Sequence, residues 1–239
     1  MLPEYSHYSP SPDLRPRAEA DGLFCAVGDV HGSLSKLQAL LARCEQGAGG
    51  VPLTFVFLGD YIDRGADSAG VVRYLMELQA RLGRRMIALK GNHEGMVLDV
   101  CNGASPESYW RSQGGEATLR SYGVARAQDL PEADLNWFRA LPLSYDDGRR
   151  FYVHAGVDPL LPLHAQREHD LIWIREPFLS DRRDYGRLIV HGHTPLETGE
   201  PDLRANRLNL DTGAVFGGPL SAALFTAAQT EPLSFVQAG

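Results

Sequence analysis

Three short polar motifs in the first half of the chain each follow an apolar run. They are residues 28–32 (GDVHG), 59–65 (GDYIDRG) and 91–94 (GNHE). The preceding apolar runs are typical of buried strands. Because ligands bind at the carboxyl edge of the strands in open α/β sheets, we expect the polar side chains to meet at one edge. Aspartate, histidine and asparagine suit Mn, Fe or Zn ions, so the pattern predicts a metal site there.

The elements that must position these motifs alternate between strand and helix. Strands are predicted at residues 23–27, 53–58 and 86–90. We expect one helix to begin after Ser33 as its cap and to run to about residue 43. A second helix should follow residues 67–68 and end at Gly83. Strands and helices that alternate at this spacing predict βαβ units, so these three strands should be parallel.

The second half of the chain changes character. Residues 94–143 have an interrupted helical pattern, including an amphipathic piece at 131–141. Strands are then predicted at residues 151–153, 188–190, 208–216, 221–225 and 233–236. Residues 217–219 (GGP) predict a hairpin between two of these strands. The pattern favours an α/β fold in one domain, with two packed mixed sheets flanked by helices.

Composition and charge exclude several classes of protein. The 239 residues are 44% hydrophobic and 22% charged, which is typical of a globular chain with one core. The net charge of −7 argues against binding to nucleic acid or to an anionic membrane. The sequence contains neither an apolar run that could span a membrane nor the pattern of a signal peptide. We therefore expect a cytoplasmic protein.

The N-terminal residues and the cysteines are interpreted as follows. Residues 1–20 are rich in proline and have little to bury, which predicts a flexible tail before a catalytic domain at 21–239. Cys25, Cys44 and Cys101 have no metal-binding spacing, and their odd number gives no disulfide framework. Cys25 and Cys44 are expected to be buried free thiols.

Two further motifs complete a resemblance to a known family. Residues 154–156 (HAG) and 191–193 (HGH) also follow apolar runs. In this order the five motifs resemble the phosphoprotein phosphatase branch of the calcineurin-like metallophosphoesterases. Residues 172–175 (IWIR) and 211–216 (DTGAVF), with Trp110 before two glycines, resemble the small bacterial and phage lambda-type serine/threonine phosphatases. The resemblance implies the sandwich fold of that family and a phosphatase activity.

The resemblance also implies a site for two divalent metal ions, for which Mn²⁺ is the first expectation and Fe, Zn or Ni are alternatives. It assigns Asp29, His31 and Asp60 to one ion, and Asp60, Asn92, His154 and His193 to the other. Two cations about 4 Å apart lower the pKa of a shared water and stabilise an in-line displacement. Hydrolysis is then expected to be direct, without a phosphoenzyme.

Further residues are implied to bind the phosphate group and to protonate the leaving group. Arg64 and Arg175 are expected to bind phosphate oxygens, together with Asn92 and His93, because a guanidinium offers two parallel donors. His93 is expected to act as the general acid and Asp63 to hold its ring in the charged form. Lys90 departs from the family pattern, since the phage-type enzyme has arginine at that position.

Plainer interpretations exist for several of these residues. A lone aspartate at a strand end usually caps a turn, but Asp29 and Asp60 share that position with a histidine and with each other. Arg64 could pair with Asp67, and Asp63 could pair with Arg64. The remaining side chains are expected to be structural or solvated, namely Glu94, His7, His164, His169 and His191.

Three functions follow, in decreasing order of support. The first is a phosphatase acting on phosphate monoesters, with phosphoserine and phosphothreonine residues of proteins as the expected substrates and small phosphoesters as the alternative. The second is a symmetric diadenosine tetraphosphate hydrolase, in which a non-acidic residue usually stands in place of Asp63 and GNHD in place of GNHE. The third is a non-catalytic binding module. No nucleic-acid or membrane partner is expected, and a monomer is the expected state.

Overall fold

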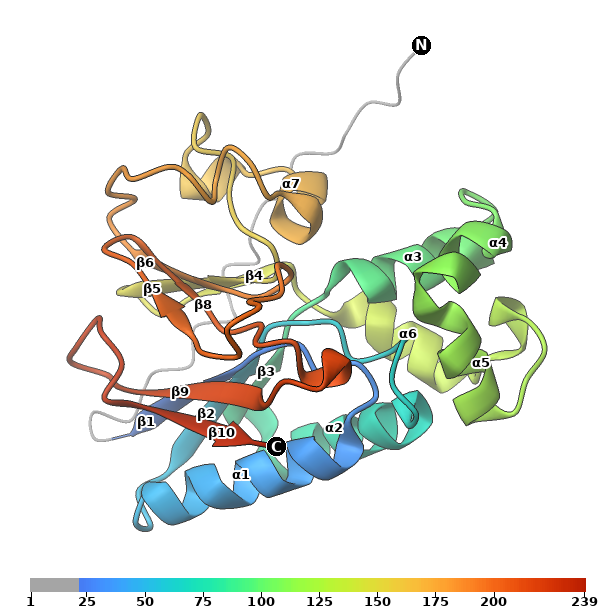
Figure 1. The fold of residues 1–239 in the computed structure, drawn as a ribbon, viewed down its shortest axis with the longest axis horizontal. Helices are drawn as coiled ribbons and strands as arrows, with labels where there is room; N and C mark the ends of the chain where they lie inside the picture. Colours follow the sequence, from blue (N-terminus) through green and yellow to red (C-terminus); the bar gives the residue numbers. More distant parts are fainter. Residues whose placement is uncertain (1–21) are drawn as a thin grey trace.

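Two five-stranded mixed β-sheets lie face to face in the computed structural model, which describes residues 22–239 (Figure 1). In the first sheet the strand order is β10-β9-β1-β2-β3. Its strands are β1 (Leu23–Val27), β2 (Leu53–Phe57), β3 (Met86–Ala88), β9 (Leu220–Thr226) and β10 (Ser234–Ala238). The strands β1, β2 and β3 are parallel, as predicted, and β9 and β10 extend the sheet with antiparallel pairing.

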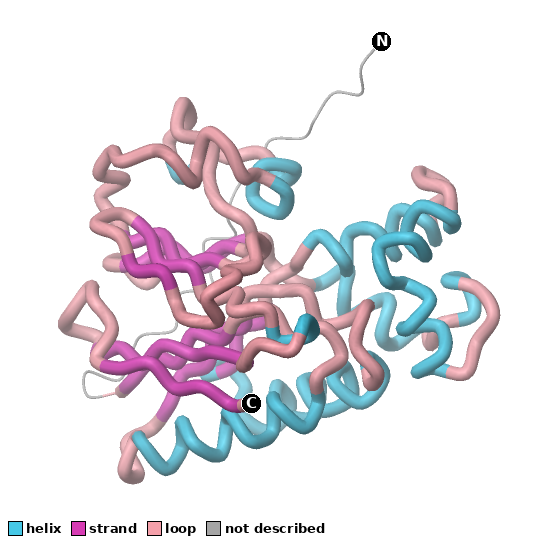
Figure 2. The backbone as a smooth tube through the Cα atoms, in the orientation of Figure 1, coloured by secondary structure: helices cyan, strands magenta, loops and turns pink. Residues whose placement is uncertain are grey.

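The second sheet has the order β4-β5-β6-β8-β7. Its strands are β4 (Ser144–Asp146), β5 (Arg150–Val153), β6 (Leu188–His191), β7 (Asp202–Leu203) and β8 (Arg207–Asn209). The central strands β5, β6 and β8 are parallel, and β4 and β7 pair antiparallel at the two edges. The two layers of strands are seen edge-on in Figure 2.

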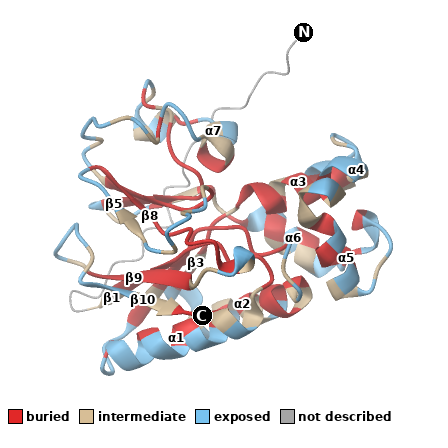
Figure 3. Ribbon diagram, viewed as in Figure 1, coloured by how far each residue is buried: buried red, intermediate tan, exposed pale blue. Residues whose placement is uncertain are grey.

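Alternation along the strands builds the layers, because successive side chains of a strand point to opposite faces. On β1, Phe24 and Ala26 face the second sheet and join an apolar core between the two sheets. Cys25 and Val27 point the other way, into the core under the helices. On β5, Phe151 and Val153 belong to a third cluster on the outer face of the second sheet. Figure 3 shows that the buried residues follow these layers.

Helices cover both outer faces. Helices α1 (Leu34–Gly47) and α2 (Ser68–Leu82) pack on the first sheet, and α7 (Glu168–Trp173) packs on the second. A group of shorter helices lies beside the sheets: α3 (Asn92–Cys101), α4 (Glu107–Trp110), α5 (Glu116–Tyr122) and α6 (Glu132–Ala140). Short 3-10 turns are formed by Gly83–Arg85, Ala127–Asp129, Leu163–Ala165 and Ala214–Phe216.

Helix boundaries agree with the sequence at α2 and α6 but not at α1, and α7 has no counterpart among the predicted helices. That helix continues through Gly47, four residues beyond the expected end, and the Ser33 side chain makes no capping hydrogen bond. Asp67 does cap α2, because its carboxylate accepts a hydrogen bond from the amide of Gly70. Helix α2 ends at Gly83, as predicted, where φ is +55°.

The predicted hairpin around residues 217–219 is wrong. The strand before this turn, β8, lies in the second sheet, whereas the strand after it, β9, lies in the first. Residues 210–219 cross between the sheets, with Gly213 and Gly217 in left-handed conformations. The alternation of apolar and polar side chains shows that a strand is half-buried, but not which sheet it joins. The strand predicted at residues 208–216 is therefore too long, because β8 ends at Asn209. The hairpins present among the described residues join β4 to β5, β7 to β8 and β9 to β10.

Other expectations about the whole chain are confirmed or lie outside the described residues. The fold is a single α/β domain of two mixed sheets. Cys25 and Cys44 are buried free thiols, and Cys101 is half-buried. None of the helices within residues 22–239 combines the length and apolarity that crossing a membrane requires. The flexible tail predicted at 1–20 falls outside the described residues.

The core between the sheets can be tested with one substitution at two paired positions. Leu208 on β8 is fully buried between the sheets, whereas its register partner on β7, Leu203, is 40% exposed. We expect Leu208→Ala to lower the free energy of unfolding by about 2–5 kcal/mol, since it leaves a cavity. Leu203→Ala should cost less than about 1 kcal/mol. Urea denaturation measures both, and equal losses would contradict the assigned layers.

Candidate active site

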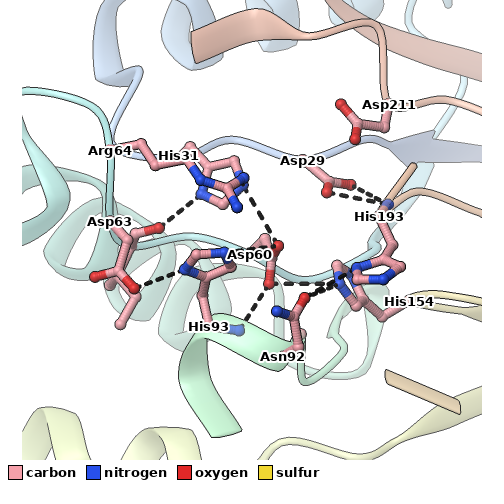
Figure 4. Close-up of polar contacts among 12 residues, drawn as sticks. Asp29, His31, Asp60, Asp63, Arg64, Asn92, His93, His154, His193 and Asp211 are labelled. Carbon is pink, nitrogen blue, oxygen red and sulfur yellow. Dashed lines mark hydrogen bonds and ion pairs between the residues drawn. The ribbon is translucent and has the colours of Figure 1, made fainter. Parts of the chain in front are cut away.

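Five loops meet where strands of both sheets end, and they bring the predicted residues together (Figure 4). The loops follow β1, β2, β3, β5 and β6. They contribute Asp29 and His31, then Asp60, Asp63 and Arg64, then Asn92 and His93, then His154, and finally His193. All of these side chains except that of Arg64 are buried.

The loops fit together by close contact between their backbones. Gly59 has φ +106°, and a Cβ there would lie 2.7 Å from the backbone of Gly91 and 2.9 Å from the ring of His154. A side chain at Gly59 would therefore separate the loops after β2, β3 and β5. Asp60 (φ +55°) and His193 (φ +65°) also adopt left-handed conformations, which few residues other than glycine adopt.

Glu94 stabilises the loops after β2 and β3. Its carboxylate accepts hydrogen bonds from the amides of Asp60 (3.0 Å), Tyr61 (2.8 Å) and Gly91 (2.9 Å). Burial, together with the charge of Asp60, raises the pKa of Glu94 to about 7. These contacts agree with the structural role expected for Glu94.

Two groups of side chains could each hold a metal ion. One contains His31, Asp60 and His93, and the other contains Asp60, His154 and His193. Asp60 is common to both, and its two oxygens face different partners. Its Oδ2 lies 3.4 Å from His31 Nε2, and its Oδ1 lies 3.4 Å from His154 Nε2. This is the geometry that a carboxylate bridging two cations would need.

The tautomers of two histidines suit metal binding. Nδ1 of His31 donates to the carbonyl of Ile62 (2.8 Å), and Nδ1 of His154 donates to the carbonyl of Leu58 (2.9 Å). Each Nε2 lone pair is then directed into the site, as second-shell hydrogen bonds do for metal ligands.

Asn92 brings a second acceptor to this place. Its Oδ1 lies 2.9 Å from His154 Nε2 and 3.0 Å from His193 Nδ1. The lone pair of His154 and the amide oxygen of Asn92 thus face each other, and two acceptors need a cation or a proton between them. The donor set therefore fits a metal ion.

The electrostatics distinguish the histidines from one another. Burial lowers the pKa of His31 to about 3, and burial together with His154 lowers the pKa of His193 to about 3. Burial also lowers the pKa of His154. Burial would raise the pKa of Asp60, but the surrounding histidines hold it below its usual value. At neutral pH the site thus presents neutral imidazoles around a carboxylate, the protonation states that metal binding requires.

His93 differs from these three. Burial would lower its pKa, but the carboxylates of Asp60 and Asp63 raise it above the usual value. Nδ1 of His93 lies 2.6 Å from Asp63 Oδ2, and its Nε2 lies 3.9 Å from Asp60 Oδ2. The expected Asp63–His93 pair is thus present, and the pairing of Asp63 with Arg64 that was the plainer alternative is not the arrangement found.

The two arginines expected to bind phosphate are exposed. Arg64 donates to Nε2 of His31 at 2.7 Å, and its guanidinium lies 5.5 Å from the ring centre of Phe216. Arg175 is exposed, and its positive charge is among the causes of the low pKa of His193. Lys90 is turned toward Glu168, with its Nζ 3.4 Å from the carboxylate.

The sequence did not single out Asp211. This carboxyl is buried beside the site, and burial raises its pKa to about 6. Asp211 and Asp60 add to the effect of burial in raising the pKa of Asp29, whose carboxylate accepts a hydrogen bond from the amide of His193 (3.1 Å). The sequence signal for Asp211 is the run DTGAVF at residues 211–216, which lies inside the strand predicted at 208–216.

Within residues 22–239, three other histidines lie outside the two groups, and His7 falls outside the described residues. His191 is buried against Phe178, with its Nδ1 3.0 Å from the carbonyl of Gly192. His164 and His169 are exposed, as expected. His169 stacks on Trp173.

Comparison with known proteins agrees with this arrangement. The chain is 35% identical over 205 residues to serine/threonine-protein phosphatase 1 of Salmonella typhimurium, covering 82% of this chain and 89% of that protein. It is 37% identical over 200 residues to a symmetrical bis(5'-nucleosyl)-tetraphosphatase of Ralstonia nicotianae, covering 80% of this chain and 61% of that protein.

The fold has relatives among solved structures. A protein serine/threonine phosphatase from Saccharomyces cerevisiae superposes with a TM-score of 0.63 at 17% identity, over 88% of this chain and 74% of that one. The sequence profile described as calcineurin-like phosphoesterase matches residues 23–218, which include every loop of the site. The chain therefore belongs to the calcineurin-like phosphoesterase family.

Proposed function

We propose that this protein hydrolyses phosphate monoesters with the help of two divalent cations, and that its substrates are phosphoserine and phosphothreonine residues of proteins. The observation that carries the proposal is the placement of Asp60 among the neutral imidazoles of His31, His154 and His193, next to the Asp63–His93 pair. The serine/threonine-phosphatase relative from Salmonella, of which the chain covers 89%, supports the substrate class.

The proposed metal ligands are the six residues expected from the sequence. Asp29, His31 and Asp60 would hold one ion, and Asp60, Asn92, His154 and His193 the other. Two such ions would supply an acidified water and charge stabilisation for an in-line displacement. We propose Mn²⁺ as the working ion because carboxylate, amide and imidazole ligands suit it.

The phosphoryl group would be oriented by donors at the mouth of the site. Arg64 is exposed and already directs its guanidinium at His31, so it can reach a phosphate oxygen above the metal groups. Arg175 adds positive charge from the side of His193. The side chains of Asn92 and His93 complete the phosphate contacts. A guanidinium suits this task because it stays charged and presents two parallel donors.

His93 would protonate the oxygen of the leaving alcohol. It lies within one of the two metal-binding groups by distance, but Asp60 and Asp63 raise its pKa, whereas the pKa values of His31, His154 and His193 are lowered. Its Nδ1 lies 2.6 Å from Asp63. The carboxylate keeps the ring protonated and fixes its orientation, so that the Nε2 proton is directed into the site. We therefore assign His93 to proton transfer and not to metal binding.

Symmetric hydrolysis of diadenosine tetraphosphate is the second candidate. The relative from Ralstonia, at 37% identity, favours it. Asp63 and Glu94 favour the phosphatase, because the motif pattern of the sister enzymes has a non-acidic residue in place of Asp63 and usually GNHD in place of GNHE. In this chain both carboxylates are buried and hydrogen-bonded. Asp63 bonds to His93, and Glu94 accepts hydrogen bonds from three amides.

A substrate panel tests the proposed function. Chelator-stripped protein is reloaded with Mn²⁺ and given phosphoserine, phosphothreonine and phosphotyrosine peptides beside diadenosine tetraphosphate, and phosphate release is measured. We expect metal-dependent turnover of the serine and threonine peptides. Preference for the dinucleotide would support the second candidate instead, and metal binding without any turnover would support a binding module.

Asp60→Asn tests the bridging carboxylate. Replacing one oxygen by an amide removes the charge that both metal groups share, so metal content and activity should fall together to background. Elemental analysis and phosphate release measure the two. Asp184→Asn, at an exposed position, is the matched control and should change neither. Full metal content in Asp60→Asn would contradict the bridge.

His93→Asn separates proton transfer from metal binding. We expect metal content to be retained and turnover of phosphoserine peptides to fall by roughly 10²–10⁴-fold, as for the loss of a general acid. His164→Asn, on an exposed histidine, should leave both unchanged. Loss of metal from His93→Asn would show that this residue is a ligand.

A further inference from the structure

Asp63 is held by side chains from a segment far along the chain. The carboxylate is fully buried, and both of its oxygens are hydrogen-bonded. Besides His93, the donors are Trp110 Nε1, 2.8 Å from Oδ2, and Thr118 Oγ1, 2.6 Å from Oδ1. Trp110 ends α4 and Thr118 lies in α5, so both belong to the group of helices beside the sheets.

Thr118 contacts Asp63 at two points. Its hydroxyl donates to the carboxylate and at the same time accepts the backbone amide of Asp63 at 2.8 Å. Asp63 has φ +73°, a conformation that is costly for a residue with a side chain. The two bonds to Thr118 hold both the backbone and the carboxylate of Asp63, whose amide also lies 3.1 Å from Ser68 Oγ.

Trp110 shares an acceptor with the proposed general acid. Its Nε1 and Nδ1 of His93 both bond to Oδ2 of Asp63. The indole is completely buried and packs on Gly115, where a Cβ would lie 2.4 Å from the ring. In the turn between Trp110 and Thr118, the carbonyl of Gly114 accepts the amide of Arg64 at 3.1 Å. The segment therefore holds Asp63 and Arg64 together.

We propose that Trp110 and Thr118 are positioning residues for proton transfer, acting on His93 through Asp63. The inference rests on the proposed function of His93. A general acid must hold its proton within hydrogen-bond reach of the leaving oxygen. Because the Asp63 carboxylate orients the ring of His93, any freedom of that carboxylate would be passed on to the ring. Two buried donors from α4 and α5 orient that carboxylate, as outer hydrogen bonds do for other catalytic groups.

The test exploits the leaving group. A serine alkoxide is a poor leaving group and needs a proton, whereas p-nitrophenolate is stable and leaves without one. We expect Thr118→Val to lower kcat for a phosphoserine peptide by about 10–100-fold, the usual cost of losing such a hydrogen bond. The kcat for p-nitrophenyl phosphate should change less than about threefold, and KM should be unchanged for both. Thr118→Ser, which retains the hydroxyl, should restore the peptide activity.

A second variant and two controls complete the design. Trp110→Phe removes the other donor and should show the same substrate dependence. Thr54→Val makes the same change on β2, at a half-buried position away from the site, and should affect neither substrate. In a His93→Asn background, Thr118→Val should cause no further loss, because both changes remove the same function.

The outcomes separate the two proposals. The positioning role would be overturned if Thr118→Val lowered kcat equally for the phosphoserine peptide and for p-nitrophenyl phosphate. It would also be overturned if Thr118→Val lowered activity further in the His93→Asn background. In either case Thr118 would be structural only. If His93→Asn itself lowered kcat equally for both substrates, the general-acid role would be wrong, and the positioning role with it. If the wild-type protein hydrolysed neither substrate, the proposed function would fail first.

Discussion

The carboxylate of Asp60 is the group on which the arrangement of this protein depends. It lies between His31 on one side and His154 on the other, at 3.4 Å from each, and it is almost completely buried. A buried charge is costly unless it is paired. The amide of His93 donates to Oδ1 of Asp60 at 3.0 Å, and cations bound by the neighbouring imidazoles would supply the pairing. The backbone must also adopt a left-handed conformation to place Asp60 there, and Glu94 stabilises the turn by accepting its amide.

Much of this site was predictable because each motif reports a local event. An apolar run, a glycine and a polar residue together indicate a strand that ends at a sheet edge, and this was correct at Asp29, Asp60, Asn92, His154 and His193. The parallel order of β1, β2 and β3 followed from the helices between them. The second sheet was harder to predict, because short strands such as β7 and β8 have few side chains to show alternation.

Contacts between segments that are distant in the chain could not be predicted from the sequence. Trp110 and Thr118 lie 47 and 55 residues from Asp63, and no local pattern shows that an indole and a hydroxyl reach the same carboxylate. Asp211 was hidden for another reason. It lies two residues after the end of β8, and the apolar residues at 208, 210 and 214–216 favour a longer strand that includes it. The chain in fact leaves the second sheet there and crosses to the first, which no propensity of single residues encodes.

The position of β1 in the first sheet has a consequence for how this protein folds during synthesis. Residues 23–27 pair with residues 53–57 on one side and with residues 222–226 on the other. The first contact forms early, but the second must wait until almost the whole chain has been made, and pairing over such a separation is slow. Until then the open edge of β1 is a template for pairing with other chains. A nascent chain that stalls before β9 therefore carries nearly all the site residues on an unfinished sheet, and its hazard is aggregation more than loss of chemistry.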